Sequence, residues 1–305
     1  MKIKFQKIAA TVAVLICFIS SNVYAAALML TTSSGDFDTI ILEGNSSPTV
    51  GIIFINGRGQ PVDGAVVSEL RISMNNSGYT TLAFANAEPA AGTTFADYVA
   101  DAESGTSTVF PEMHERIQAA LAHFEGLGIQ QVIIAGFSLG ARFASEFVAR
   151  ETSDVDIDIV GLVGLGMYSM QSTTPGEIDY APDALNLVTT LDEVDLPVLD
   201  IYGDNDFFAD DATDRPNAYV NGGGQPANYT QTELDCPDAV IGLDCHVFGD
   251  SDDGLKGSDD SPLETAVRDW IEDLAPLSTP LPEPGTLMLM LVGLLGLGVR
   301  HYKTK

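Results

Sequence analysis

Basic residues, histidines and cysteines are all scarce in this chain of 305 residues. It has 14 lysines and arginines against 43 acidic residues, which gives a formal net charge of −29, and only 4 histidines and 3 cysteines. Such an acidic surface repels phosphate backbones, which argues against nucleic-acid binding and disfavours polyanionic substrates. The chain also lacks a dinucleotide-binding fingerprint and a Gly-Lys-Ser phosphate loop, so no cofactor is expected.

The first 25 residues have the organisation of a signal peptide. Lys2, Lys4 and Lys7 precede an apolar stretch over residues 8–19, and Val23-Tyr24-Ala25 forms a small-residue cleavage site. We expect cleavage after Ala25 and export of the remaining chain. Between residues 26 and 281 there are 8 basic and 42 acidic residues, a net charge of about −34 for the processed protein.

Cysteine usage agrees with export. Cys17 leaves with the signal peptide, and the remaining pair, Cys236 and Cys245, is expected to form a disulfide in an oxidising compartment. Closing a loop of about ten residues would stabilise the fold by at most about 2.7 kcal/mol. Metal binding by this pair is the weaker alternative, because no further ligands lie nearby in the sequence.

The acidic stretch over residues 250–260 raises the question of calcium binding. It lacks the alternating ligand spacing and the terminal glutamate of an EF-hand loop. A solvated loop is therefore favoured over a loose calcium site, and no metal is expected.

The C-terminal end combines a proline-rich linker over residues 276–284, an apolar run over 285–299 and a basic cluster from Arg300 to Lys305. The run is short for a spanning helix, but the basic residues after it suit an inner-membrane stop with a cytoplasmic tail. Pro282-Glu283-Pro284 followed by these parts resembles the PEP-CTERM sorting signal of Gram-negative bacteria. The resemblance implies that an exosortase removes the tail of residues 285–305 and passes the protein to the cell surface or the extracellular polymer matrix. The alternative is an ordinary C-terminal membrane anchor.

Residues 26–275 have the length of one α/β domain, and strand-like runs alternate there with helical ones. This order predicts a mostly parallel central sheet with helices on both faces. Strands are predicted over residues 51–55, 79–84, 132–135, 157–165 and 197–202, and helices over 65–75, 111–128, 141–150, 183–191 and 262–274. Ser261, Pro262 and Glu264 form a capping box at the start of the last helix.

The most informative motif is Gly136-Phe137-Ser138-Leu139-Gly140, which lies between a predicted buried strand and a predicted helix. A G-x-S-x-G sequence at such a turn lifts the serine hydroxyl clear of the sheet and requires a strained backbone at the serine. The glycines allow close approach of the neighbouring chain. Ser138 is therefore the candidate nucleophile; the alternative is a tightly packed turn without chemistry.

With this motif in this element order, residues 45–275 resemble the α/β-hydrolase superfamily, and within it small bacterial groups of unknown function. The resemblance implies a triad in the chain order Ser, Asp or Glu, His. His246 occupies the family's position, in a loop before the last helix, whereas His301 lies in the tail and His114 and His123 are expected on a solvated helix face. The proposed disulfide would hold the loop of His246 in place.

The carboxylate of the triad is expected after the strand that ends near Gly203. The family's acid commonly stands three residues beyond such a glycine, which indicates Asp206, with Asp204 as the alternative. Asp210 and Asp211 are expected to be solvated charges at a helix start.

Two backbone N–H groups should form the oxyanion hole. Leu139 supplies one, directly after the serine, and Arg58 is the best candidate for the other. The family often has histidine where this chain has Asn56, and because the donor is a backbone group this departure does not remove it. Asn56 is expected to order the loop.

These residues favour an exported serine hydrolase that cleaves a small-molecule or polymer-linked ester, or less readily an amide, through an acyl-enzyme. The alternative is a surface or matrix protein that uses the same fold as a binding module without turnover.

Overall fold

The structure, a computed structural model, describes residues 25–44, 49–87, 109–150, 155–168, 187–206, 208–209, 211–235, 248 and 261–277. In chain order its elements are β1 (Ala26–Thr32), β2 (Gly35–Leu42), β3 (Val50–Ile55), α2 (Ala65–Asn76), β4 (Thr80–Phe84), α4 (Val109–Gly126), β5 (Gln131–Phe137), α5 (Leu139–Ala149), β6 (Asp158–Leu165), α6 (Leu187–Leu191), β7 (Val198–Gly203), α7 (Arg215–Asn221), the 3₁₀ turn η2 (Pro226–Asn228), β8 (Tyr229–Leu234) and α9 (Pro262–Leu274).

The strands form one sheet in the order β1-β2-β4-β3-β5-β6-β7-β8. β1 and β2 pair antiparallel, β2 also pairs antiparallel with β4, and the six strands from β4 to β8 run parallel. The predicted mostly parallel sheet is confirmed. Because parallel strands end at one edge, the loops that follow β3, β5, β6 and β7 are brought together there.

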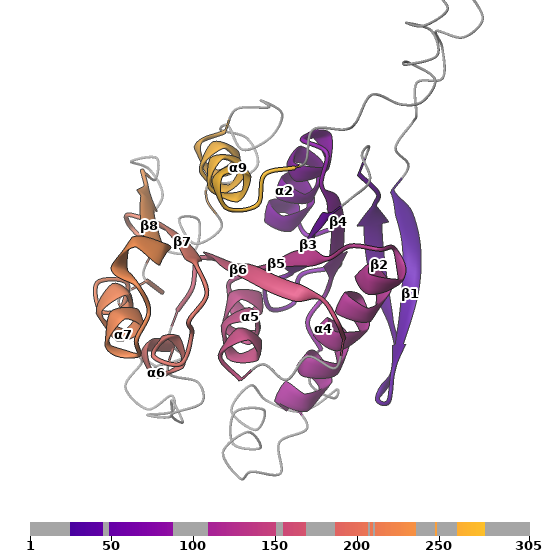
Figure 1. Cartoon of the computed structure of the whole chain (residues 1–305), viewed down its shortest axis with the longest axis horizontal. Coiled ribbons are helices and arrows are strands. Elements are labelled where there is room, and N and C mark those ends of the chain that lie inside the picture. The colour runs from indigo at the N-terminus through magenta and orange to yellow at the C-terminus, as the bar shows by residue number, and fades with distance from the viewer. Residues whose placement is uncertain are drawn as a thin grey trace, which may run out of the picture.

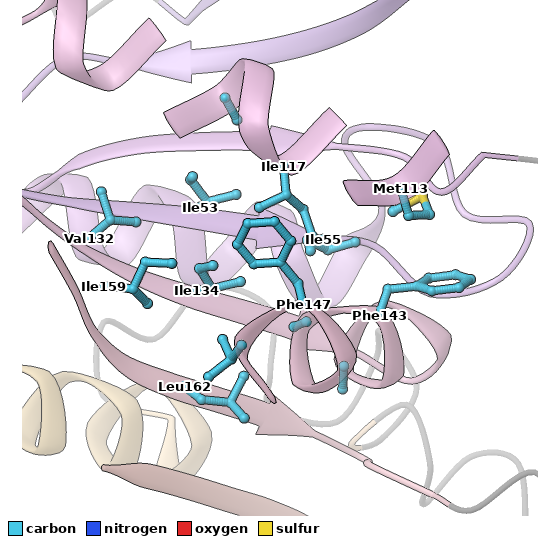
Figure 2. Close-up of a cluster of buried hydrophobic side chains, with 14 of the residues drawn as sticks. Ile53, Ile55, Met113, Ile117, Val132, Ile134, Phe143, Phe147, Ile159 and Leu162 are labelled. Atoms are coloured by element: carbon cyan, nitrogen blue, oxygen red, sulfur yellow. The ribbon is translucent and has the colours of Figure 1, made fainter. Parts of the chain in front are cut away.

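Helices cover both faces of the sheet, with α2 and α9 on one side and α4, α5, α6 and α7 on the other (Figure 1). Alternate residues of β3 divide between the two cores: Ile53 and Ile55 belong to one, Ile52 and Phe54 to the other. Figure 2 shows the first core, where Ile117 of α4 and Phe147 of α5 lie against the sheet.

The helix predictions are largely confirmed. Met113, Ile117, Leu121 and Phe124 form one stripe of α4, and all four are fully buried. The hydroxyl of Ser261 accepts a hydrogen bond from the Glu264 backbone N–H at 3.1 Å, as in the predicted capping box. The helix after Ser138, α5, is buried on all sides from Leu139 to Val148.

Besides the 3₁₀ turn η2, four elements were not predicted from the sequence: β1, β2, α7 and β8. Three of them are strands, of which β1 and β8 lie at the two edges of the sheet. Of the helix predicted over 183–191, the described part is α6, Leu187–Leu191.

Candidate active site

Ser138 stands at the turn between β5 and α5 with a φ of 53° and a ψ of −120°. A non-glycine residue in this region costs about 1–3 kcal/mol and persists only where its surroundings enforce it. A backbone hydrogen bond helps to hold this conformation: the Ser138 N–H donates to the carbonyl of Leu165, at the end of the neighbouring strand β6, at 2.8 Å. Ser138 has 9% of its surface exposed.

Both flanking glycines are required by close backbone contacts. A Cβ atom at Gly136 would lie 2.5 Å from the Cα of Ala141, and one at Gly140 would lie 2.5 Å from the carbonyl oxygen of Asn56. Either distance is shorter than real Cβ atoms show. The chain can therefore make this turn only with glycine at both positions.

The loop after β3 lies directly beside the serine. The register pairs Ile55 of β3 with Gly136 of β5, so the residues that follow these two strands lie side by side. A Cβ at Gly57 would lie 3.3 Å from the Cβ of Ser138. Asn56 is buried, and its side-chain amide donates to the carbonyls of Val62 at 3.1 Å and Phe84 at 3.3 Å. These bonds tie the loop to β4, which is the ordering role expected of Asn56.

The candidate oxyanion donors lie on the two sides of this contact. Leu139 opens α5, and the first N–H groups of a helix have no partner within the helix. Arg58 follows Gly57 in the loop and is exposed.

The two candidate acids after β7 differ in environment. Asp206 is buried, with 7% of its surface exposed, and its Oδ1 accepts a hydrogen bond from the Phe208 N–H at 2.9 Å. Asp204 is exposed and its carboxylate contacts the side chain of Asn205 at 3.0 Å. A fixed, sheltered carboxylate is the one suited to orient a base.

The strand order separates Ser138 and Asp206 by one strand, β6. Neighbouring strands lie about 4.8 Å apart, so the ends of β5 and β7 are about 10 Å apart. The two candidate residues at this spacing leave room for one side chain between them.

His246, Cys236 and Cys245 lie outside the described residues, as does the acidic stretch over 250–260. Phe248, two positions after His246, is described and buried. Its ring lies 6.4 Å from the ring of Phe137, the residue before Ser138, measured between centroids.

Tyr168 is a site residue that the sequence did not indicate. It follows β6, and a hydrogen bond joins its hydroxyl to the Ser138 side chain. Burial raises the pKa of this hydroxyl above its usual value, although the bond to Ser138 and the charges of Arg58 and Arg142 oppose the shift. The pattern around position 168 carries no motif, so only the folded chain reveals this neighbour of the serine.

Arg215 fixes the loops that follow β6 and β7. It is fully buried and its Nη1 contacts Asp200 Oδ1 at 2.9 Å, while its Nη2 donates to the Met167 carbonyl and to Asp211 Oδ1. Asp211 has only 12% of its side chain exposed, so its predicted solvated position is wrong. It is part of a buried ion pair because Arg215 lies one helical turn further along the chain.

His114 also departs from its predicted solvated position. Its ring packs edge-on against Phe147, with centroids 5.2 Å apart. Burial and the charge of Arg150 lower its pKa. A cavity of about 520 Å³ borders it, between the β1–β2 turn, α4 and the end of α5. Within the described ranges no group of three metal-ligating side chains gathers.

Solved structures with a similar fold include esterases and a dienelactone hydrolase. An esterase of Pyrococcus furiosus aligns with 83% of this chain and 93% of its own, at 15% identity and a TM-score of 0.54. A dienelactone hydrolase from Anabaena variabilis aligns with 83% of this chain and 98% of its own, at 15% identity and a TM-score of 0.54. Est1E from Butyrivibrio proteoclasticus aligns with 82% and 99%, at 15% identity and a TM-score of 0.54. The chain therefore has the α/β-hydrolase fold, as the sequence predicted.

The C-terminal end carries a sorting signal. Residues 280–303 match the PEP-CTERM protein-sorting motif, which confirms the resemblance seen in the sequence and supports export and sorting to the cell surface. A search among curated protein sequences gave no match. Among the helices that the structure describes, none combines the length and apolar character needed to cross a membrane; the apolar run over 285–299 lies outside these residues.

Proposed function

We propose that this protein is an exported serine hydrolase that cleaves carboxylic esters, or less readily amides, through an acyl-enzyme. The observation that carries the proposal is the strained backbone of Ser138 at the strand–helix turn, held by two obligatory glycine contacts. Residues with such backbone strain cluster at active sites and other functional sites. The buried carboxylate of Asp206 at the same sheet edge supports it.

In the proposed reaction Ser138 Oγ attacks the ester carbon while His246 accepts the hydroxyl proton. The carbon–oxygen bond to the leaving alcohol then breaks, and the imidazolium returns the proton to that oxygen. Water, activated by the same imidazole, attacks the acyl-enzyme and releases the acid. Asp206 orients the imidazole, and the N–H groups of Leu139 and Arg58 bind the negative oxygen of each tetrahedral intermediate.

The place of His246 is supported by the contact between Phe248 and Phe137. His246 stands two positions before Phe248 in the sequence, and we propose that this short separation lets its side chain reach Ser138. The disulfide between Cys236 and Cys245 is proposed to stiffen this segment.

The PEP-CTERM tail is proposed to hold the protein at the inner membrane until an exosortase-type enzyme removes it. The mature enzyme would then act at the cell surface or in the extracellular matrix, on small-molecule or polymer-linked esters.

A fluorophosphonate probe tests the nucleophile, because it phosphonylates only an activated serine. The full-length protein should be labelled covalently, and Ser138→Ala should not. Ser73→Ala, which removes a half-buried hydroxyl on α2, is the matched control and should label like the wild type. A folded wild type that resists the probe, with no turnover of short- or long-acyl esters, would instead support a non-catalytic binding protein on this fold.

A further inference from the structure

β1 forms an open edge of the sheet. Among the strands that the structure describes, it ends the strand order and pairs with β2 alone (Figure 1). That pairing is regular from Ala26 to Thr32, with one residue of β1 opposite each residue of β2. The outer side of β1 therefore presents a straight row of backbone groups that face no described strand, and such an edge is a template for pairing with another chain.

The sequence of β1 does not protect this edge. Edge strands of soluble proteins usually carry a charge, a proline or a bulge that blocks pairing. Residues 26–32 have the sequence Ala-Ala-Leu-Met-Leu-Thr-Thr, without a charged residue or a proline, although 43 of the 305 residues of the chain are acidic. The opposite edge strand, β8, does carry an exposed charge, at Glu233.

The apolar side chains of β1 are only partly covered. Leu28 and Leu30 are half-buried and pack against the first core from the edge of the sheet. Met29 lies on the other face of the strand, and with 60% of its surface exposed it is the most exposed large apolar side chain in the described part of the chain. A strand added along β1 would cover more of all three side chains.

The strand matches a second copy of itself. In an antiparallel two-fold pair over all seven residues, Met29 lies opposite Met29 of the second copy, and Leu28 lies opposite Leu30 of the second copy. Apolar cross-strand pairs of this kind stabilise a sheet, and no like charges meet along the strand. Charges further away than about 8 Å are largely screened at physiological ionic strength, so the acidic remainder of each copy opposes the contact only weakly.

The ends of the strand also match in charge. With the expected cleavage after Ala25, the mature chain begins at Ala26 with a positive α-amino group. In the two-fold pair this group lies opposite Thr32 of the second copy, about two strand spacings, or about 10 Å, from the backbone of Asp36 on β2. The symmetry forms this contact twice, so a second copy fits the edge at its centre and at both ends.

We infer that β1 is a docking surface for a second copy of this chain, through which two sheets join into one continuous sheet. A contact made by a single short strand is small, so we expect a dissociation constant of about 10 µM. Three strands, β2, β4 and β3, separate β1 from β5. The candidate active site of each copy therefore lies away from the contact.

Single cysteines test the register. Met29→Cys places two thiols opposite one another, within the Cα separation of about 4.4–6.8 Å that a disulfide needs. The exported protein, at about 100 µM and under mild oxidation, should then give a disulfide-linked dimer on a non-reducing gel. Ala27→Cys places its two thiols four residues out of register, about 14 Å apart, and should stay monomeric.

Mixing Ala27→Cys with Thr31→Cys should restore the cross-link, because these two positions lie opposite one another in the two-fold pair. Equal cross-linking of Met29→Cys and Ala27→Cys, or no cross-linking of Met29→Cys, would overturn the inference.

Sedimentation measures the strength of the contact. Met29→Lys places two positive charges opposite one another at its centre and should weaken dimerisation by about 10-fold or more, with an unchanged far-UV circular dichroism spectrum because the position is exposed. Thr230→Lys, at an exposed position of β8 on the opposite edge, is the matched control and should sediment like the wild type. A wild type that stays monomeric at about 100 µM, or a dimer that Met29→Lys leaves intact, would refute the proposed contact.

Discussion

Replacement of Arg215 by methionine should destabilise the fold strongly. Arg215 and Asp200 are both fully buried, with Nη1 and Oδ1 2.9 Å apart, and Tyr229 and Gln231 also donate to Asp200 at 2.9 and 2.8 Å. The substitution removes the cation but leaves the carboxylate buried. Breaking a buried pair in this way costs about 3–5 kcal/mol, a large part of a typical stability of about 5–15 kcal/mol.

The pH dependence gives the prediction a sharper signature. Burial raises the pKa of Asp200, and Arg215 is the main group that opposes the shift. Without Arg215 the carboxyl pKa in the folded variant rises further above its unfolded value. Folding of the variant is then favoured below the unfolded pKa and weakens as pH rises through the folded one. The free energy of unfolding that Arg215→Met loses relative to the wild type should therefore be larger at about pH 8 than at about pH 5.

Urea unfolding followed by far-UV circular dichroism measures both effects. Arg268→Met is the matched control, because Arg268 contacts Asp269 at 3.9 Å on the surface and should cost less than about 1 kcal/mol. Adding Asp200→Asn to Arg215→Met should recover part of the loss, since the fully buried position 200 then carries no charge, although the carboxylate of Asp211, with 12% of its side chain exposed, stays in place. A deficit below about 1 kcal/mol, or one that does not change with pH, would refute the reasoning.

Three further predictions concern the serine turn, the acid and His114. Gly140→Ala should cost about 3 kcal/mol or more in urea unfolding, because its Cβ would meet the Asn56 carbonyl, whereas Gly126→Ala, with open space around it, should be tolerated. Asp206→Asn should lower kcat by about 10⁴-fold and Asp204→Asn should leave it nearly unchanged; the reverse result would make Asp204 the acid. Burial lowers the pKa of His114, so its contribution to stability is present above about pH 6.5 and is lost as pH falls. Between about pH 6.5 and 5, the melting temperature of His114→Phe should therefore decline less than that of the wild type.

The central strands and the serine turn were predictable because their signals are local. β5 is an unbroken apolar run, and G-x-S-x-G at its end specifies both the strain and the glycine contacts. Edge strands carry weaker signals: β8 has the sequence Tyr-Thr-Gln-Thr-Glu-Leu and contacts the sheet on one side only. β1 and β2 alternate exposed with more buried residues around a Ser33-Ser34-Gly35 turn, a hairpin pattern without the unbroken apolar runs of the central strands.

The candidate site divides in the same way. Ser138 lies in a recognisable motif at a strand end, and the resemblance to the α/β-hydrolase superfamily indicated Asp206, three residues beyond Gly203. Tyr168 and the Arg215 network depend on contacts between loops after different strands, and no sequence spacing encodes which side chains meet there. The pairing of Asp211 with Arg215 has a helical spacing, but its importance comes from the burial of Asp200 beneath it.

The distribution of arginines bears on the substrate of the proposed hydrolase. Residues 26–281 contain eight basic side chains; the structure describes seven of them, and three of these, Arg71, Arg142 and Arg215, are buried. Four acidic side chains, Glu146, Asp200, Asp206 and Glu264, are buried as well, so the surface keeps the strongly negative balance of the composition. Arg58 is exposed beside Ser138 and is a basic group at the edge of the site. An acidic exterior of this kind repels anionic esters during approach and does not affect neutral ones, and the repulsion weakens as salt shortens the range of the field. The charge pattern therefore favours neutral ester groups as substrates.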